Sequence, residues 1–320
     1  MKKMLFLLLL LLSICSVGLA ADNTQDFYKL EMQRLMRKVR TEGRIKNPSF
    51  GILVNGGTNI YYPPAYASNN NANAENAIAL VDGILIESFN FGFNYQNGAK
   101  TPVEVKKYFL KTIELAKKNK VALFNIDYCR SSRQQNTAMR LSRKEGFVNY
   151  AATRGLDELP LVALNDKNVR KLQACENFCV LLNPHKFASK EIYLASLRKS
   201  SYDLLIIDGY FGDSFFTAAD IAGLRVKPNG KRRLVYCYMS LGEAENYRWY
   251  WKQAYHNERP EWLDEPNENW QGSYKVKYWM QPWHDIIYNA RDSYLSKIVD
   301  AGFDGAFLDV IDAFEYFQAK

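Results

Sequence analysis

Five carboxylates, each placed just after a mainly apolar run, are the residues of this sequence best suited to do chemistry. They are Glu87, Asp127, Asp208, Glu243 and Asp309. A single acid in such a place is usually a helix cap or a loop ion pair. Five of them would converge if the runs were parallel strands of one barrel, because the carboxyl ends of barrel strands meet at one mouth. A pair of carboxyl groups there is what glycoside hydrolysis needs, and crowding raises the pKa of one of them, which keeps it protonated as the acid.

Acids at one mouth require strands that alternate with helices, and the sequence has this order. Helical stretches such as 103–118 and 136–144 separate short apolar runs, which predicts a parallel sheet. A barrel of this kind has eight places, so one of nine candidates must lie outside it; we expect this of 276–279, which stands among polar and aromatic residues. The nine candidate strands are 51–54, 83–87, 121–127, 146–151, 178–182, 204–208, 234–240, 276–279 and 305–309. The predicted fold class is therefore α/β, a (β/α)8 TIM barrel.

Other reaction classes find little support in the sequence. The three histidines, His185, His256 and His284, have no metal-ligand spacing, and Cys175 and Cys179 have no second pair to complete a metal site. The sequence has neither a G-x-S-x-G motif nor a glycine-rich phosphate loop. We therefore expect no metal and no cofactor.

One segment holds every tryptophan of the chain, between residues 241 and 285. Indole rings near barrel loops can stack on the apolar face of a sugar, or they can simply pack a long loop, and the sequence leaves both roles open. Residues 61–75, rich in Asn, Ala and Pro, are expected to form another long loop. The six tryptophans are Trp249, Trp251, Trp262, Trp270, Trp279 and Trp283.

The first twenty residues have the pattern of a secretory signal peptide. Lys2 and Lys3 precede an apolar run from Leu5 to Leu12, and small residues follow up to Ala20. The run is shorter than the roughly 18 residues of a membrane span, which argues against an anchor. A lipoprotein signal at Cys15 is the other alternative, but Ile14 occupies a position where a small residue is expected. We expect an exported protein, periplasmic or extracellular, with no membrane span after cleavage and one domain over residues 21–320.

Length and charge fit this interpretation. About 300 mature residues are normal for one (β/α)8 barrel. The formal net charge of the chain is +8, but the lysines are dispersed over helical segments, and the chain is expected to be exported. We therefore expect a solvated basic surface rather than a nucleic-acid site. Four cysteines beyond Cys15 allow three full disulfide pairings, among which the sequence does not choose.

Three long motifs resemble glycoside hydrolase family 114, whose members are endo-α-1,4-polygalactosaminidase-like TIM barrels. They are Y-M-S-L-G-E-A-E-N-Y-R-W-Y-W at 238–251, Y-K-V-K-Y-W at 274–279 and G-F-D-G-A-F-L-D-V-I-D-A-F-E-Y-F at 302–317. A further run, Y-D-L-L-I-I-D at 202–208, fits an early strand of the family. The resemblance covers roughly residues 175–317 and implies a hydrolase of an amino-sugar polysaccharide.

The order of the strands is the point where this sequence departs from the family. The strand with Asp309 falls in mid-domain there, and later strands bring a second acid. Here segments resembling those later strands come first, as I-L-V-N-G-G at 52–57 and V-D-G-I-L-I-E-S-F at 81–89, followed by 121–129 and 146–152. We therefore expect a circularly permuted barrel. A fold tolerates circular permutation when its two chain ends lie close together. A truncated tandem array is the alternative.

By this resemblance Asp309 matches the catalytic aspartate of the family and Glu87 its catalytic glutamate. Glu87 would be the general acid and Asp309 the nucleophile or base. Arg248 would orient a carboxylate or sugar hydroxyl groups, or else form a structural ion pair. The residues expected to line the cleft are Asp208, Glu243, Tyr247, Arg248, Asp127 and Tyr128.

Three other functions remain open at this point. A catalytically silent carbohydrate-binding barrel would tolerate the loss of Asp309 or Glu87, yet both are present. A hydrolase of another polysaccharide would use the same acid pair on a different sugar. An envelope scaffold is supported only by the surface charge.

Overall fold

The computed structural model describes residues 23–62, 77–162 and 164–320, and its centre is one parallel sheet of eight strands. The expected signal peptide and most of the expected loop 61–75 lie outside the described residues. The order of the strands in the sheet is β4-β3-β2-β1-β13-β9-β6-β5. Their bounds are β1 Gly51–Asn55, β2 Gly83–Glu87, β3 Ala122–Tyr128, β4 Val148–Ala152, β5 Phe178–Leu181, β6 Leu204–Ile207, β9 Leu234–Ser240 and β13 Gly305–Asp309.

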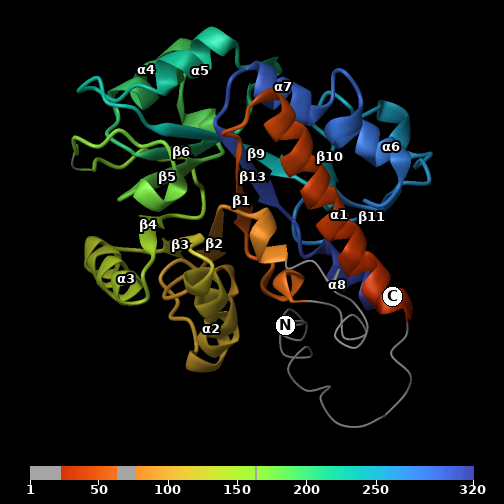
Figure 1. Ribbon diagram of the computed structural model, residues 1–320, viewed down its shortest axis with the longest axis horizontal. Coiled ribbons are helices and arrows are strands. Elements are labelled where there is room, and N and C mark those ends of the chain that lie inside the picture. The colour runs from red at the N-terminus through yellow and green to blue at the C-terminus, as the bar shows by residue number, and fades with distance from the viewer. Residues whose placement is uncertain (1–22, 63–76, 163) are drawn as a thin grey trace.

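These strands follow one another around a nearly closed barrel (Figure 1). The last strand, β13, pairs in parallel with the first, β1, and with β9. The remaining gap lies between β4 and β5, which do not pair as strands in the described part of the chain but come together through side chains. The Tyr150 hydroxyl lies 3.6 Å from Cys179 Sγ, and its ring centroid lies 5.6 Å from that of Phe178. The predicted barrel of parallel strands is thus confirmed.

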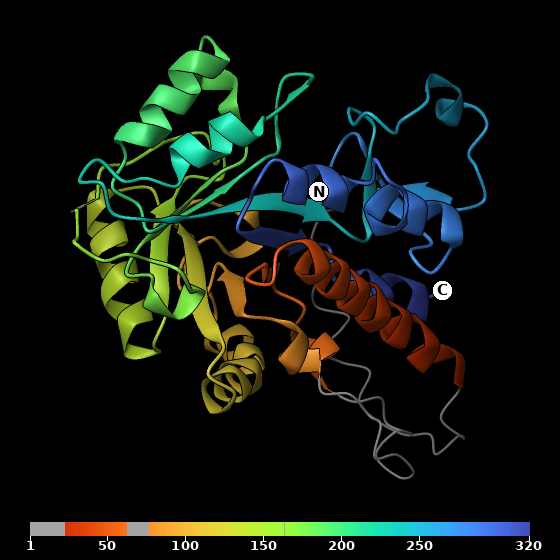
Figure 2. The same ribbon diagram turned by 45° about the horizontal axis from the view of Figure 1, so that its top comes forward.

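The ninth candidate strand lies outside the barrel, as predicted. Within 276–279 only Val276 is in a strand, at the end of β12 (Ser273–Val276). This strand pairs antiparallel with β10 (Glu243–Glu245) and β11 (Leu263–Pro266) in a separate three-stranded sheet. The small sheet is an insertion after β9, and Figure 2 shows this part of the chain on the side away from α2 and α3. A further hairpin, β7 (Tyr210–Phe211) with β8 (Ser214–Phe215), follows β6.

Helices cover most of the outer face of the barrel. The α-helices after the strands are α2 Val103–Lys118, α3 Ser132–Lys144, α4 Lys190–Lys199, α5 Ala218–Leu224, α6 Gln281–His284, α7 Tyr294–Asp300 and α8 Ala313–Gln318. Serine or threonine caps begin several of them: Thr217 and Asp220 form a full capping box at α5. Between β4 and β5 the described residues contain one 3-10 turn, Leu172–Ala174, and no α-helix.

Helix α1 (Asn23–Lys46) lies against α7 and α8, although it opens the described chain. Near its beginning, the Tyr28 ring centroid lies 5.5 Å from that of Phe317 in α8. At its other end Arg44 donates to Asp82, ahead of β2, and Lys46 donates to Asp300 at the end of α7. Helix α1 thus packs where a crossover helix between β13 and β1 would lie (Figure 1).

Packing inside the barrel explains two glycines in neighbouring strands. Gly51 in β1 pairs with Gly305 in β13, which pairs with Tyr236 in β9. A Cβ atom at Gly51 would lie 1.9 Å from the Tyr236 hydroxyl, and one at Gly305 would lie 2.6 Å from its ring. The Tyr236 side chain therefore fills the space that two larger residues would need.

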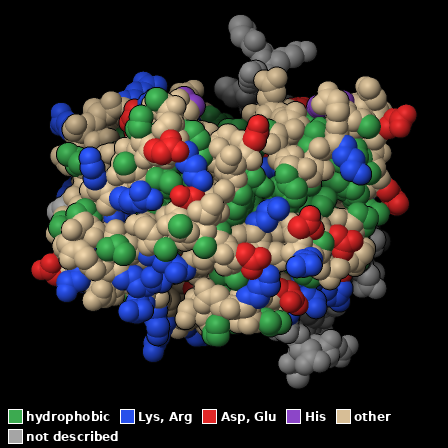
Figure 3. Space-filling view, turned by 90° about the horizontal axis from the view of Figure 1, so that it is seen from above, with side chains coloured by type: hydrophobic (Ala, Val, Ile, Leu, Met, Phe, Trp, Pro, Cys, Tyr) green, Lys and Arg blue, Asp and Glu red, His purple; other side chains and the backbone are tan. Residues whose placement is uncertain are grey.

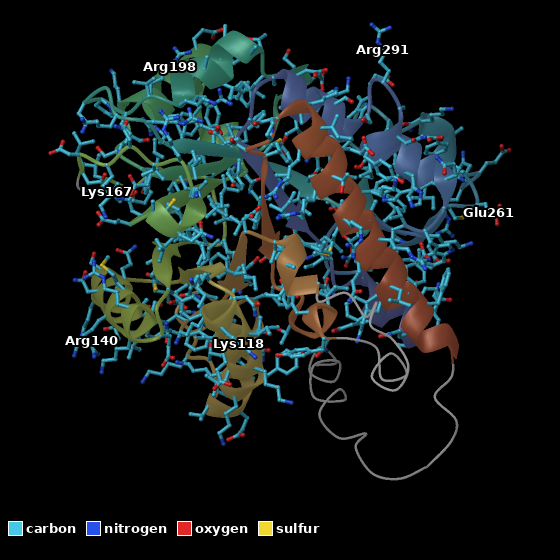
Figure 4. The ribbon with its side chains drawn as sticks, in the orientation of Figure 1. Lys118, Arg140, Lys167, Arg198, Glu261 and Arg291 are labelled. Atoms are coloured by element: carbon cyan, nitrogen blue, oxygen red, sulfur yellow. The ribbon has the colours of Figure 1, made fainter. Side chains whose placement is uncertain are left out.

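Charged side chains cover the surface, and the cysteines lie inside. Lys118, Arg140, Arg198 and Arg291 point outward (Figure 4), and acidic groups are interspersed among basic ones on the face seen in Figure 3. The thiols of Cys129, Cys175, Cys179 and Cys237 are all buried and unpaired, so the structure contains none of the three pairings that the sequence allowed. None of the helices in the described part of the chain combines the length and hydropathy of a membrane span.

Candidate active site

Glu87 and Asp309 meet at the carboxyl ends of β2 and β13, with β1 between them. Asn55, the last residue of β1, donates through Nδ2 to Glu87 Oε1 at 2.8 Å and to Asp309 Oδ1 at 2.9 Å. Since both bonds share this nitrogen, the two oxygens lie no more than about 5.7 Å apart, the 2.8 Å and 2.9 Å lengths end to end. Parallel register places three polar side chains at one rim, as the strand-end acids predict.

Each acid has one further donor. The Tyr128 hydroxyl at the end of β3 donates to Glu87 Oε2 at 2.7 Å, so both oxygens of Glu87 accept. The Val310 backbone N–H donates to Asp309 Oδ1 at 2.9 Å. In the part of the chain that the structure describes, no hydrogen bond reaches Asp309 Oδ2. Asp309 therefore has one oxygen free to react.

The backbone is strained directly after both acids. Ser88 and Val310 each have a φ of 56°, in the left-handed region that residues other than glycine rarely adopt. Strain of this kind is retained where the surrounding structure fixes it, and it clusters at functional sites. Here it ends each strand abruptly at the acid.

Burial and the neighbouring charge act together on Asp309. Removal from water, then the Glu87 carboxylate, raise the pKa of Asp309 to about 7, against the lowering effect of the Asn55 and Val310 hydrogen bonds. A carboxyl group with this pKa is half protonated at neutral pH. The pair therefore keeps a proton up to about pH 7, as a hydrolase that needs one acid requires.

A second cluster on the mouth is built around Arg248. Its guanidinium group donates to both oxygens of Asp208 at 2.8 Å and, through Nε, to Glu245 at 2.6 Å. The Arg248 side chain is only 2% exposed. The Tyr247 hydroxyl donates to the other oxygen of Glu245 at 2.6 Å. Of the two roles left open for Arg248, the structure favours the ion pair, since its donors are directed at protein carboxylates.

Glu243 and Asp312 add negative charge beside the pair. Glu243 accepts from Asn267 at 2.7 Å and pairs with Lys275. Asp312 follows β13 and is exposed, and it is near enough for its charge to add to the raised pKa of Asp309. In the described residues no group of three or more His, Cys, Asp or Glu side chains is arranged to hold a metal ion.

Asp127 does not join this mouth. It is fully buried, and it accepts hydrogen bonds from the Asn90 and Phe91 N–H groups at 2.6 and 2.9 Å and from Asn149 at 3.1 Å. Its partner Ser142 lies in α3, outside the sheet. The side chain therefore faces the helix layer, because it alternates with Tyr128, which faces the mouth. We do not include Asp127 in the site.

The tryptophans divide between packing and exposure. Trp262 and Trp283 are buried and stack with centroids 5.3 Å apart. Trp251 and Trp279 are half-buried. Trp249 and Trp270 are the exposed members of the set.

Sequence reasoning missed Asn55 and Arg154. Asn55 stands after an apolar run in the same way as the acids, and that placement was the available signal. Arg154 lies after β4, and its guanidinium group stacks on the Tyr128 ring at 4.1 Å. No spacing in the sequence marks this contact.

Comparison with known proteins supports one family for the C-terminal part. Residues 184–320 match the sequence model of Glycoside-hydrolase family GH114. An uncharacterized protein of Methanocaldococcus jannaschii is 33% identical over 178 residues, 53% of this chain and 49% of that protein. Another, of Thermotoga maritima, is 46% identical over 83 residues, 26% of this chain and 24% of that protein. The chain thus spans about half or less of these curated relatives.

Among solved structures, the chain is similar to a crystal structure of Aspergillus fumigatus Ega3 in complex with galactosamine. The match has 24% identity and a TM-score of 0.27, and it covers 36% of this chain and 39% of that one. The matched family segment contains Asp208, Glu243 and Asp309, while Asn55 and Glu87 lie outside it. The resemblance expected from the motifs is thus confirmed: residues 184–320 carry the sequence pattern of Glycoside-hydrolase family GH114.

Proposed function

We propose that this protein is an exported glycoside hydrolase that cleaves an amino-sugar polysaccharide with the carboxyl pair Asp309 and Glu87. The observation that carries the proposal is the shared Asn55 amide, which holds the two acids together at the barrel mouth. The match of residues 184–320 to a glycoside hydrolase family supports the reaction class. The glycan, α-1,4-galactosaminoglycan-like, rests on the family resemblance.

The spacing of the pair favours hydrolysis with retention. Retaining enzymes hold their carboxyl groups roughly 5–5.5 Å apart, and inverting ones roughly 6.5–9.5 Å apart, to admit a water. The bridged oxygens of Glu87 and Asp309 lie no more than about 5.7 Å apart, which is below the inverting range. Asp309 would attack the anomeric carbon through its free oxygen while Glu87 protonates the leaving oxygen. Glu87 would then take a proton from the water that cleaves the glycosyl ester.

For these roles the single proton of the pair must lie on Glu87 and not on Asp309. In the ligand-free protein the raised pKa of Asp309 favours the proton there. A sugar ammonium group next to Asp309 would favour its ionised form, leaving the single proton of the pair on Glu87. A substrate with free amines would thereby prepare its own nucleophile. The exposed carboxylate of Asp312 would add to the attraction for such a substrate.

We also propose that residues 1–20 direct export and that residues 21–320 form one barrel with a permuted strand order. The packing of α1 against α7 and α8 supports the permuted order, because it places the first helix of the described chain beside the helices that flank β13. Export would be tested by fusing residues 1–22 to a reporter and measuring its cleavage and location.

The test of the function is the release of reducing ends from partly deacetylated α-1,4-galactosaminoglycan. Wild-type protein is compared with Asp309→Asn and Glu87→Gln, whose folding is checked by circular dichroism. Activity in the wild type and its loss in both variants would support the acid pair. Binding of the glycan without hydrolysis by the wild type would instead favour the carbohydrate-binding barrel, and no binding would favour a different glycan.

A further inference from the structure

Two exposed aromatic rings touch at the mouth of the barrel. Tyr95 is 64% exposed and Trp270 is 57% exposed. Their ring centroids lie 6.4 Å apart, and their planes meet at 76°. Rings of this size normally pack away from water, so an exposed aromatic pair at a candidate active site points to a ligand.

The contact joins loops from different sides of the acid pair. Tyr95 ends the 3-10 turn Phe93–Tyr95, which follows β2. Trp270 lies in the turn between β11 and β12, in the insertion that follows β9. In the barrel, β2 and β9 are separated by β1 and β13, the strands of Asn55 and Asp309. The two rings therefore meet along the part of the rim that holds the acids.

Tyr95 is fixed in relation to Glu87 by one arginine. The Arg154 guanidinium carbon lies 5.1 Å from the centroid of the Tyr95 ring and 4.1 Å from that of Tyr128. Arg154 also donates to the Gly92 carbonyl at 2.5 Å. Since the Tyr128 hydroxyl donates to Glu87, the exposed ring is two side chains away from the proposed acid.

The backbone at Tyr95 is strained as well. Asn94 and Tyr95 have φ angles of 51° and 58°, and a bulky residue rarely adopts this region. Burial of the Tyr95 side chain does not offset the strain, because most of the side chain is exposed. Backbone strain that is not offset by burial of the side chain is typical of residues at functional sites.

The two rings form an apolar corner that suits one kind of partner. One face of a pyranose ring carries C–H groups and can stack on an aromatic face, while its rim of hydroxyl groups stays in water. A second ring at a steep angle would contact the edge of the same sugar. We propose that Tyr95 and Trp270 form a stacking subsite for one pyranose ring of the polymer, next to the bond that is cleaved. This inference rests on the proposed function for its choice of glycan.

The test measures binding apart from hydrolysis. Oligosaccharides of partly deacetylated α-1,4-galactosaminoglycan are titrated into the Asp309→Asn protein by calorimetry. Adding Tyr95→Ala or Trp270→Ala should raise the dissociation constant about tenfold, the loss expected of one stacking contact. Tyr95→Phe, which keeps the ring, should stay within about twofold. Phe27→Ala is the control, since Phe27 is 40% exposed and contacts Tyr28 and Trp279.

Each outcome decides between the two proposals. Unchanged binding in both alanine variants, or a loss of stability alone, would mean that the rings only brace the two loops, and it would overturn the subsite even if the wild type hydrolyses the polymer. Weakened binding together with an inactive wild type would keep the subsite and overturn the hydrolase. No binding to the Asp309→Asn protein would overturn the subsite.

Discussion

Glu87 and Asp309 are coupled mechanically as well as electrostatically, because the same amide group of Asn55 fixes the position of both carboxylates. The charge of Glu87 contributes to the raised pKa of Asp309, and the Asn55 hydrogen bond opposes it. A change at Asn55 therefore alters the geometry and the proton affinity of the pair together.

Asn55→Ala should lower kcat/KM about 100-fold, since a small misplacement of reacting groups has an effect of that order. The measurement is the rate of reducing-end release, with folding checked by circular dichroism. Asn183→Ala is the matched control: Asn183 follows β5, and its side-chain amide donates to the Gly155 carbonyl at 2.6 Å. An Asn55→Ala protein with wild-type kinetics would contradict the bridging role.

The kcat/KM of the wild type should fall as pH rises through about 7. Below this pH Asp309 keeps the pair's proton, and above it the proton is lost. This fall of kcat/KM with rising pH is expected whichever acid holds the proton in the reacting complex, because the two groups titrate as a pair. A kcat/KM that stays level up to pH 8.5 would contradict the requirement for this proton.

Glu87→Gln should lower the pKa of Asp309 below its wild-type value of about 7, because a neighbouring negative charge is removed. Titration of the Asp309 carboxyl carbon by NMR measures this without activity. The wild-type protein under the same conditions is the reference. An unchanged pKa would mean that burial alone raises it.

The first sugar released should keep the anomeric configuration of the cleaved bond, because the bridged oxygens lie no more than about 5.7 Å apart, and inversion needs roughly 6.5–9.5 Å to admit a water. Proton NMR of the products within the first minutes of reaction, before mutarotation, makes the measurement. An inverted first product would exclude Asp309 as a nucleophile.

Arg248→Met should lower the free energy of unfolding by about 3–5 kcal/mol, since it leaves Asp208 and Glu245 without their buried partner. Denaturant titration measures the change. Arg291→Met, at an exposed position (Figure 4), should change it by less than about 0.5 kcal/mol. Equal effects of the two substitutions would show that the ion pairs of Arg248 with Asp208 and Glu245 contribute little to stability.

Sequence patterns predicted the barrel well because its strands are short apolar runs. The strands also follow one another around the sheet in the order in which they occur along the chain. The peripheral position of 276–279 followed from its polar surroundings. Acids at strand ends were a weaker guide to the site, because successive side chains of a strand point to opposite faces of the sheet. One residue decides whether a side chain enters the mouth, as with Tyr128, or the helix layer, as with Asp127.

Contacts made across the mouth could not be predicted in the same way. The stacking of Arg154 on Tyr128, and the meeting of Tyr95 with Trp270, depend on how loops from separate strands bend after they leave the barrel. Neither hydrophobic period nor spacing along the chain encodes that direction. The resemblance likewise named two acids but not the amide between them.

The division of the pair between two parts of the chain has a consequence for how such proteins diverge. Asp309 lies inside the segment that matches the hydrolase family, whereas Glu87 and Asn55 lie before it. Under the proposed mechanism, a substitution at Glu87 would abolish hydrolysis and one at Asn55 would weaken it, and either would leave the matched segment intact. On that proposal, a single substitution at residue 87 would separate a hydrolase from a sugar-binding protein of the same fold, and a comparison limited to the matched segment would not detect it.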